Sequence, residues 1–224
     1  MVKADELSNI ITILLVLLAV GYFITRKSAI VGAVAPTTPA ASTGITTAEQ
    51  LMSTETLNIG TAGGLVIWIP NEAHEPLDKR LSAKNGVFLP MKATIPTGCQ
   101  VAWVSDDASH SHTVTVTGMG ETKAIEADQS TEAITFTKPG TFSYKTNLTP
   151  ESGTITVTSA KAVPGKVVGA FFAPAGKTAV AGAGITVLST AAFGKDACSV
   201  YSATGTAAAV ATTMTTVTKV TPYT

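Results

Sequence analysis

The chain has 224 residues, with 15 basic and 15 acidic side chains, and only 13% of its residues are charged. This length suits one domain with additional segments, or two small domains. The even charge balance, with no basic stripe, excludes the electrostatic footprint of a nucleic-acid-binding protein. Alanine, valine, threonine and glycine dominate, and small or β-branched residues favour half-buried strands. The sequence therefore predicts a mostly β protein that binds no nucleic acid.

The first apolar feature is the uncharged run LSNIITILLVLLAVGYFI at residues 7–24. A helix rises about 1.5 Å per residue, so this run nearly crosses a bilayer core of about 30 Å. A cleaved signal peptide is the competing interpretation, with the small residues 33–35 (AVA) as the cleavage site. Asp5 and Glu6 precede the run and disfavour that reading. We predict a retained anchor helix over residues 1–27, embedded in the lipid bilayer through residues 7–24.

The next segment, residues 28–59, is rich in proline, threonine and alanine. Its stretch 35–50, APTTPAASTGITTAEQ, has no apolar periodicity. Such a composition is typical of a semi-extended spacer, so we predict a tether between the anchor and the rest of the chain.

Short β-prone runs then alternate with turn residues such as Asn85-Gly86 and Pro139-Gly140. The clearest runs are residues 65–69, 87–93, 99–104, 113–117, 133–137, 141–145 and 154–158. Regular spacing without a helix-period run between the strands indicates a Greek-key β-sandwich over residues 60–159.

Two stretches carry a family resemblance. Residues 98–117, GCQVAWVSDDASHSHTVTVT, resemble the cupredoxin segment in which a Val-x-Trp strand leads through a polar turn to a His-x-Val pair. Residues 136–158, FTKPGTFSYKTNLTPESGTITVT, resemble the closing hairpin of the same family, which carries the copper-ligand loop. The resemblance implies a cupredoxin-like fold and places His112 at the first copper ligand.

The remaining ligand positions depart from the family pattern. Thr146 stands at the cysteine position, Thr149 at the histidine position and Ser152 at the methionine position. A blue-copper site needs a thiolate and two imidazoles, and hydroxyl groups are poor ligands for a soft metal. We therefore expect no cofactor and no catalytic residue.

A different metal set is the alternative. His110 and His112 are two residues apart, so on one strand they would share a face, and His74 lies in a preceding loop. Three imidazoles suit a mononuclear copper or zinc site. The other interpretation is that Ser109 to His112 form a polar turn without a metal.

The two cysteines, Cys99 and Cys198, leave two alternatives open. One is a disulfide that ties the C-terminal region to the central domain, which would indicate an oxidising compartment. The other is a pair of buried thiols that pack as small hydrophobic residues.

Residues 160–224 lie outside the resemblance and are predicted as a small C-terminal β region. Its strand candidates are residues 167–172, 178–187, 199–202 and 207–220. The last candidate carries one charge, Lys219, and an exposed strand of that kind tends to aggregate. We expect it to fold within the chain, the alternative being that it pairs with another subunit.

Together these features predict a non-catalytic, membrane-anchored structural or assembly subunit that contacts other protein subunits, including copies of itself. The alternative function is copper binding through His110, His112 and His74, in service of a membrane metalloenzyme or copper delivery. The resemblance implies a single-pass protein of the cell envelope with its β domains outside the cytoplasm. Arg26 and Lys27 favour the opposite orientation, which suits a virion membrane with the β domains facing the capsid.

Overall fold

The computed structural model describes residues 44–71, 87–174, 184–217 and 219. Within these residues the chain is mostly β, as predicted, with twelve strands and two helices. No helix among them is long and apolar enough to cross a membrane, and the predicted anchor at residues 7–24 lies outside the described part. The elements in chain order are α2 (Ala48–Thr54), β1 (Thr56–Asn58), β2 (Ala62–Ile69), β3 (Lys92–Thr97), β4 (Cys99–Ser105), β5 (Val114–Val116), β6 (Gly120–Glu121), β7 (Ile134–Phe136), β8 (Gly140–Thr146), β9 (Ser152–Lys161), β10 (Val163–Pro174), β11 (Ile185–Phe193), β12 (Asp196–Thr204) and α3 (Ala207–Met214).

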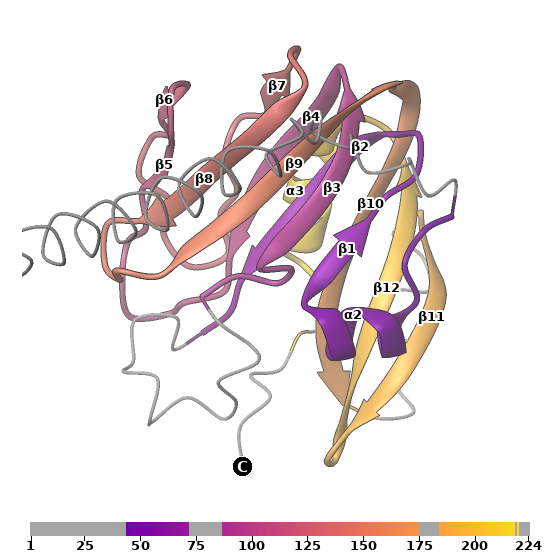
Figure 1. Cartoon of the computed structure of the whole chain (residues 1–224). Helices are drawn as coiled ribbons and strands as arrows, with labels where there is room; N and C mark the ends of the chain where they lie inside the picture. The colour runs from indigo at the N-terminus through magenta and orange to yellow at the C-terminus, as the bar shows by residue number, and fades with distance from the viewer. Residues whose placement is uncertain (1–43, 72–86, 175–183, 218, 220–224) are drawn as a thin grey trace, which may run out of the picture. The chain divides into compact units, whose positions relative to one another are not determined.

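The strands form two six-stranded sheets that face each other (Figure 1). The first sheet has the order β1-β3-β9-β8-β5-β6 and the second the order β11-β12-β10-β2-β4-β7. The described chain moves between the sheets repeatedly, and it crosses for the last time at Ala162, from β9 in the first sheet to β10 in the second. The region predicted as C-terminal β structure thus continues the second sheet, with β10 lying parallel to β2.

Large aromatic side chains fill the space between the sheets. Trp103 on β4 and Tyr144 on β8 are buried, and their ring centroids lie 5.6 Å apart. Phe88 also packs against Tyr144, with ring centroids 4.6 Å apart. Aromatic pairs at these separations stabilise a core beyond the area they bury. These contacts join the second sheet to the β8–β9 hairpin, whose loop carries the positions of the family's copper ligands.

Residues 44–58 are folded, although the sequence assigned them to the tether. Thr47 caps α2, since its hydroxyl accepts the amide of Gln50 and the Gln50 side chain accepts the amide of Thr47. This reciprocal capping box is a known helix-start signal. Leu51 is buried, and α2 packs against β1, β11 and β12. Sequence reasoning missed this short helix because it judged the segment by its proline- and threonine-rich composition.

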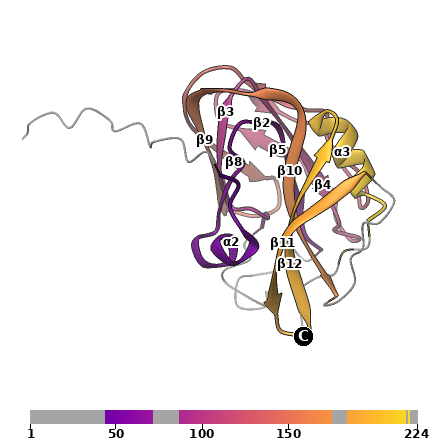
Figure 2. The ribbon, with the colours of Figure 1, turned by 90° about the vertical axis from the view of Figure 1, so that its right-hand side faces the viewer.

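The predicted strand over residues 207–220 is wrong, because Ala207–Met214 form the helix α3. Thr206 caps it by accepting the amide of Ala209, and alanine is the best helix former. Its buried side chains recur at helical spacing, namely Ala207, Val210, Ala211 and Met214. The helix lies on the outer face of the second sheet, against β2 and β4 (Figure 2). The apolar side chains of this segment are thus buried within the chain, as expected, but on a helix instead of a strand.

Candidate functional site

The loop between β4 and β5 carries two of the three histidines named as candidate ligands, His110 and His112. His112 is fully buried, and its backbone forms a two-way bridge with Ile125. Its amide donates to the Ile125 carbonyl at 2.9 Å and its carbonyl accepts the Ile125 amide at 2.8 Å. The main chain therefore holds the His112 side chain in place just before β5 begins.

Asp107 is the partner of the His112 ring. Oδ2 of this carboxylate lies 3.0 Å from Nε2 of His112, and both side chains are fully buried. Oδ1 accepts the amide of Ser109 at 2.9 Å. The contact engages Nε2 of the ring, and the Asp107 carboxyl group thereby fixes the orientation of the imidazole. The pair orients the imidazole in the way that carboxylates orient metal-binding histidines.

His110 lies on the outer side of the same carboxylate. Its Nδ1 is 3.7 Å from Oδ1 of Asp107, and its side chain is 43% exposed. The two histidines lie on a loop rather than on one strand, and each ring lies near a different oxygen of the Asp107 carboxyl group. Asp107 is absent from the predicted site, although it precedes the two histidines by three and five residues. His74, the third candidate ligand, lies outside the described residues.

Asp106, at the start of this loop, forms an ion pair with Lys219 near the C-terminus. Nζ of Lys219 lies 3.5 Å from Oδ1 of Asp106 and donates to the Met214 carbonyl at 3.0 Å. The pKa of the Asp106 carboxyl is raised, because the effect of burial is larger than the opposing effect of the nearby Lys219 ammonium. This buried contact joins the end of α3 to the loop that carries the histidines.

The loop after β8 meets the His112 segment, as the resemblance implies. Thr146 lies opposite Val114 in the β5–β8 ladder. Next to it, Asn147 forms two hydrogen bonds with Thr113. The side-chain Oδ1 of Asn147 accepts the backbone amide of Thr113 at 2.8 Å, and the backbone amide of Asn147 donates to the Thr113 carbonyl at 3.1 Å. The structure thus brings His112, just before β5, close to the position of the family's cysteine at the end of the adjacent strand β8.

The side chains on this loop do not fit a blue-copper centre. The buried Thr146 hydroxyl accepts the Leu148 amide at 3.2 Å, so it closes the turn. Thr149 is also buried, and its hydroxyl has no hydrogen-bond partner among the described residues. Ser152 begins β9 and is exposed. These hydroxyls are neutral hard donors, whereas that centre requires a thiolate and a second imidazole.

A wider search of the described part of the chain finds no cluster of three or more histidine, cysteine, aspartate or glutamate side chains that could hold a metal ion. Cys99 and Cys198 are buried free thiols, and burial raises the pKa of each to about 12. They lie on β4 and β12, three strands apart in one sheet, which is roughly 14 Å at the usual strand spacing. A disulfide needs Cα atoms within about 7 Å, so the alternative of buried thiols holds in this fold.

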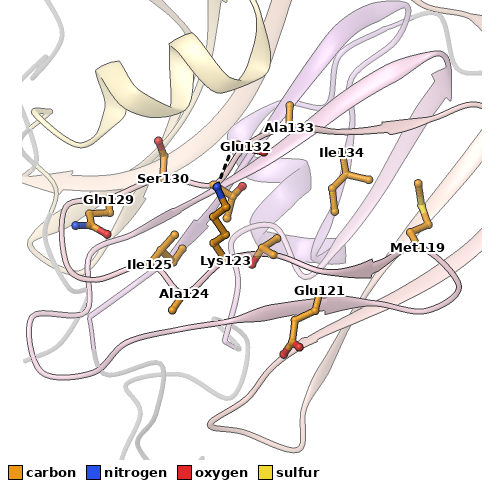
Figure 3. A pocket seen from close by; sticks show the side chains of 12 residues that line it. Met119, Glu121, Lys123, Ala124, Ile125, Gln129, Ser130, Glu132, Ala133 and Ile134 are labelled. Atoms are coloured by element: carbon orange, nitrogen blue, oxygen red, sulfur yellow. Dashed lines mark ion pairs between the residues drawn. The ribbon is translucent and has the colours of Figure 1, made fainter.

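A groove of about 460 Å³ lies beside the site, between the free edges of the two sheets at β6 and β7 (Figure 3). Ile125, whose backbone binds His112, forms part of its wall. Lys123 and Glu132 form a 3.5 Å ion pair in which both side chains are 89% exposed. Glu121, the other charged side chain of the groove, is exposed as well. None of these lining groups is a buried acid or base of the kind that active sites use.

No protein-family model and no curated protein matches the chain. Solved structures do match it, and cupredoxins are among them. A purple cupredoxin from Nitrosopumilus maritimus is 20% identical, and the match covers 42% of this chain and 99% of that protein with a TM-score of 0.36. Amicyanin from Paracoccus versutus is 24% identical over 43% of this chain and 82% of its own, with a TM-score of 0.32.

A copper-containing nitrite reductase from Thermus scotoductus matches as well. It is 18% identical, and the match covers 47% of this chain and 28% of the reductase, with a TM-score of 0.36. The expected likeness to cupredoxins is confirmed, and it concerns the fold of part of the chain.

Proposed function

We propose that this chain is a non-catalytic structural subunit. Its cupredoxin-like domain, a Greek-key sandwich extended by β10, β11 and β12, assembles with other protein subunits. A single transmembrane helix at residues 7–24 anchors it, with the β domain outside the cytoplasm. In a virion membrane, the alternative setting, the same domain faces the capsid.

The observation that carries the proposal is the hydrogen bond from the Leu148 amide to the Thr146 hydroxyl, at 3.2 Å. At the position where the family resemblance implies a copper thiolate, the side chain instead closes its own turn. Asn147 then ties that turn to Thr113, beside His112. The loop is thus held by hydroxyl and amide hydrogen bonds, which need no metal.

Copper titration of the full-length chain in detergent tests this proposal. We expect no stoichiometric copper binding and no intense visible absorption, because no thiolate is available at the loop. His112→Ala should leave the weak background uptake unchanged, and His110→Ala serves as the exposed control. Uptake of one copper per chain that disappears in His112→Ala would overturn the structural role.

The alternative function, copper binding by His112, His110 and His74, is favoured by one contact pattern. Asp107 lies 3.0 Å from the His112 ring and 3.7 Å from the His110 ring, so one carboxylate brings two imidazoles to the same place. The same titration separates the functions, since a three-histidine site predicts that His74→Ala and His110→Ala each weaken copper binding. The structural role predicts no effect of either substitution.

A further inference from the structure

Strand β11 forms one edge of the second sheet (Figure 1). It spans Ile185–Phe193, nine residues with the sequence ITVLSTAAF, and contains no charged residue and no proline. It pairs with β12 on one side, and no strand among the described residues pairs with its other side. Natural proteins usually protect such edges with short strands, lysine or proline.

The other edges of the two sheets do follow that rule. Within the described residues, β1 and β7 have three residues each and β6 has two, one of which is Glu121. A short edge offers few main-chain groups for pairing with another chain. Among the sheet edges of the described residues, only β11 is long enough to form an extended ladder.

The side chains of β11 are less buried than those of the neighbouring strand, although α2 packs against β11 and the Ser189 hydroxyl accepts the Ala48 amide at 2.9 Å. None of the nine is fully buried, whereas the adjacent β12 buries six of its nine. The odd-numbered side chains of β11, which include Ile185, Val187 and Phe193, are half-buried. Leu188 is among the large hydrophobic side chains exposed on the described surface, at 43%. A strand added beside β11 would cover part of this apolar surface.

We propose that β11 pairs in antiparallel fashion with β11 of a second copy of this chain. The pairing segment is Ser189–Phe193, because these residues keep a regular register with β12 while an irregularity lies between Val187 and Ser189. The result is a two-fold dimer in which the second sheets of both copies join into one. This pairing identifies a second copy of the chain as the subunit with which it assembles, and in that respect it rests on the proposed function.

Self-complementarity selects a second copy as the partner. In an antiparallel pair centred on Ala191, Ser189 faces Phe193 of the other copy and Thr190 faces its Ala192. Half-buried side chains then meet on one face and exposed small side chains on the other. The segment contains no charged residue, so pairing buries no charge and brings no like charges together. Copies anchored in one membrane also meet at a high effective concentration.

Site-directed crosslinking of the full-length chain in membranes tests the pairing. Thr190→Cys places a thiol on the exposed face of the segment, where a short bismaleimide joins it to its counterpart at a diagonal separation of about 7–8 Å. The native thiols give little background, because Cys99 and Cys198 are buried. Thr141→Cys is the matched control, an exposed threonine on β8, an inner strand of the first sheet.

The expected result is a covalent dimer for Thr190→Cys and none for Thr141→Cys at equal labelling. Ala192→Lys in the Thr190→Cys background should lower the yield about tenfold, because lysine on an edge strand opposes pairing. Equal crosslinking of both variants, a monomer only, or a product with another protein would each overturn the proposal. A chain that stays monomeric and binds no copper overturns this inference alone. One that crosslinks and binds stoichiometric copper at His112 overturns the proposed function alone.

Discussion

The Nε2 atom of His112 lies 3.0 Å from Oδ2 of Asp107, and neither side chain is exposed. The same carboxylate accepts the Ser109 amide, so it organises the whole turn between β4 and β5. The position that a copper protein would use for a ligand is here stabilised by a carboxylate–imidazole pair. The predictions below test how much of the domain's stability depends on such contacts.

Asp107→Ala should lower the free energy of unfolding by about 3 kcal/mol, because it leaves the buried His112 ring without its carboxylate. Urea denaturation of the wild type and the variant measures the loss. Glu132→Gln is the control, since its ion pair with Lys123 is 89% exposed on both sides and should contribute at most about 0.5 kcal/mol. Equal losses in the two variants would contradict the role assigned to Asp107.

Tyr144→Phe should cost about 1 kcal/mol, because the buried hydroxyl donates to the Pro90 carbonyl at 2.9 Å. Tyr201→Phe is the matched control. The Tyr201 hydroxyl is also buried, but it has no hydrogen-bond partner among the described residues, so its removal should be neutral or slightly stabilising. Thermal unfolding of both variants decides the matter, and a larger loss at Tyr201 would refute the assignment.

Gly153→Ala should destabilise the domain by about 2 kcal/mol, because a Cβ at this position would overlap the ring of Tyr144. The role of this glycine is to leave room for the aromatic ring. Gly44→Ala provides the control, as a Cβ there meets no atom within 4 Å. Similar midpoints of denaturation for the two variants would disprove this account of Gly153.

The two buried thiols should make stability depend on pH in alkaline solution. Burial raises the pKa of Cys99 and Cys198 from 9.0 to about 12. Between these values the unfolded chain releases protons that the folded chain keeps, so stability is full below pH 9.0 and falls as the pH rises towards 12. Unfolding free energies measured from pH 8 upward should fall more steeply in the wild type than in a Cys99→Ala/Cys198→Ala variant, at about the slope that linkage predicts for two groups. Parallel profiles would show that the thiols titrate normally.

Sequence reasoning found the strands that carry the site, because their composition is decided locally. The runs at residues 65–69, 99–104, 141–145 and 154–158 lie within β2, β4, β8 and β9. Each combines β-branched or aromatic residues with a turn at its end. The departure of Thr146 from the copper pattern was equally visible, since ligand identity is a property of the residue itself. The errors at residues 44–58 and 207–220 arose where short helices with readable caps were judged by overall composition.

Tertiary structure decided the relationships between distant or differently exposed groups. Asp107 and His112 are close in sequence, but only the fold buries both and turns one towards the other. Sequence left the pairing of Cys99 and Cys198 open, and strand order placed them too far apart for a disulfide. The long uncharged β11 became a candidate interface only once it was found at the edge of a sheet. Local propensity selects strands and turns, whereas strand order determines which edges, thiols and carboxylates have neighbours.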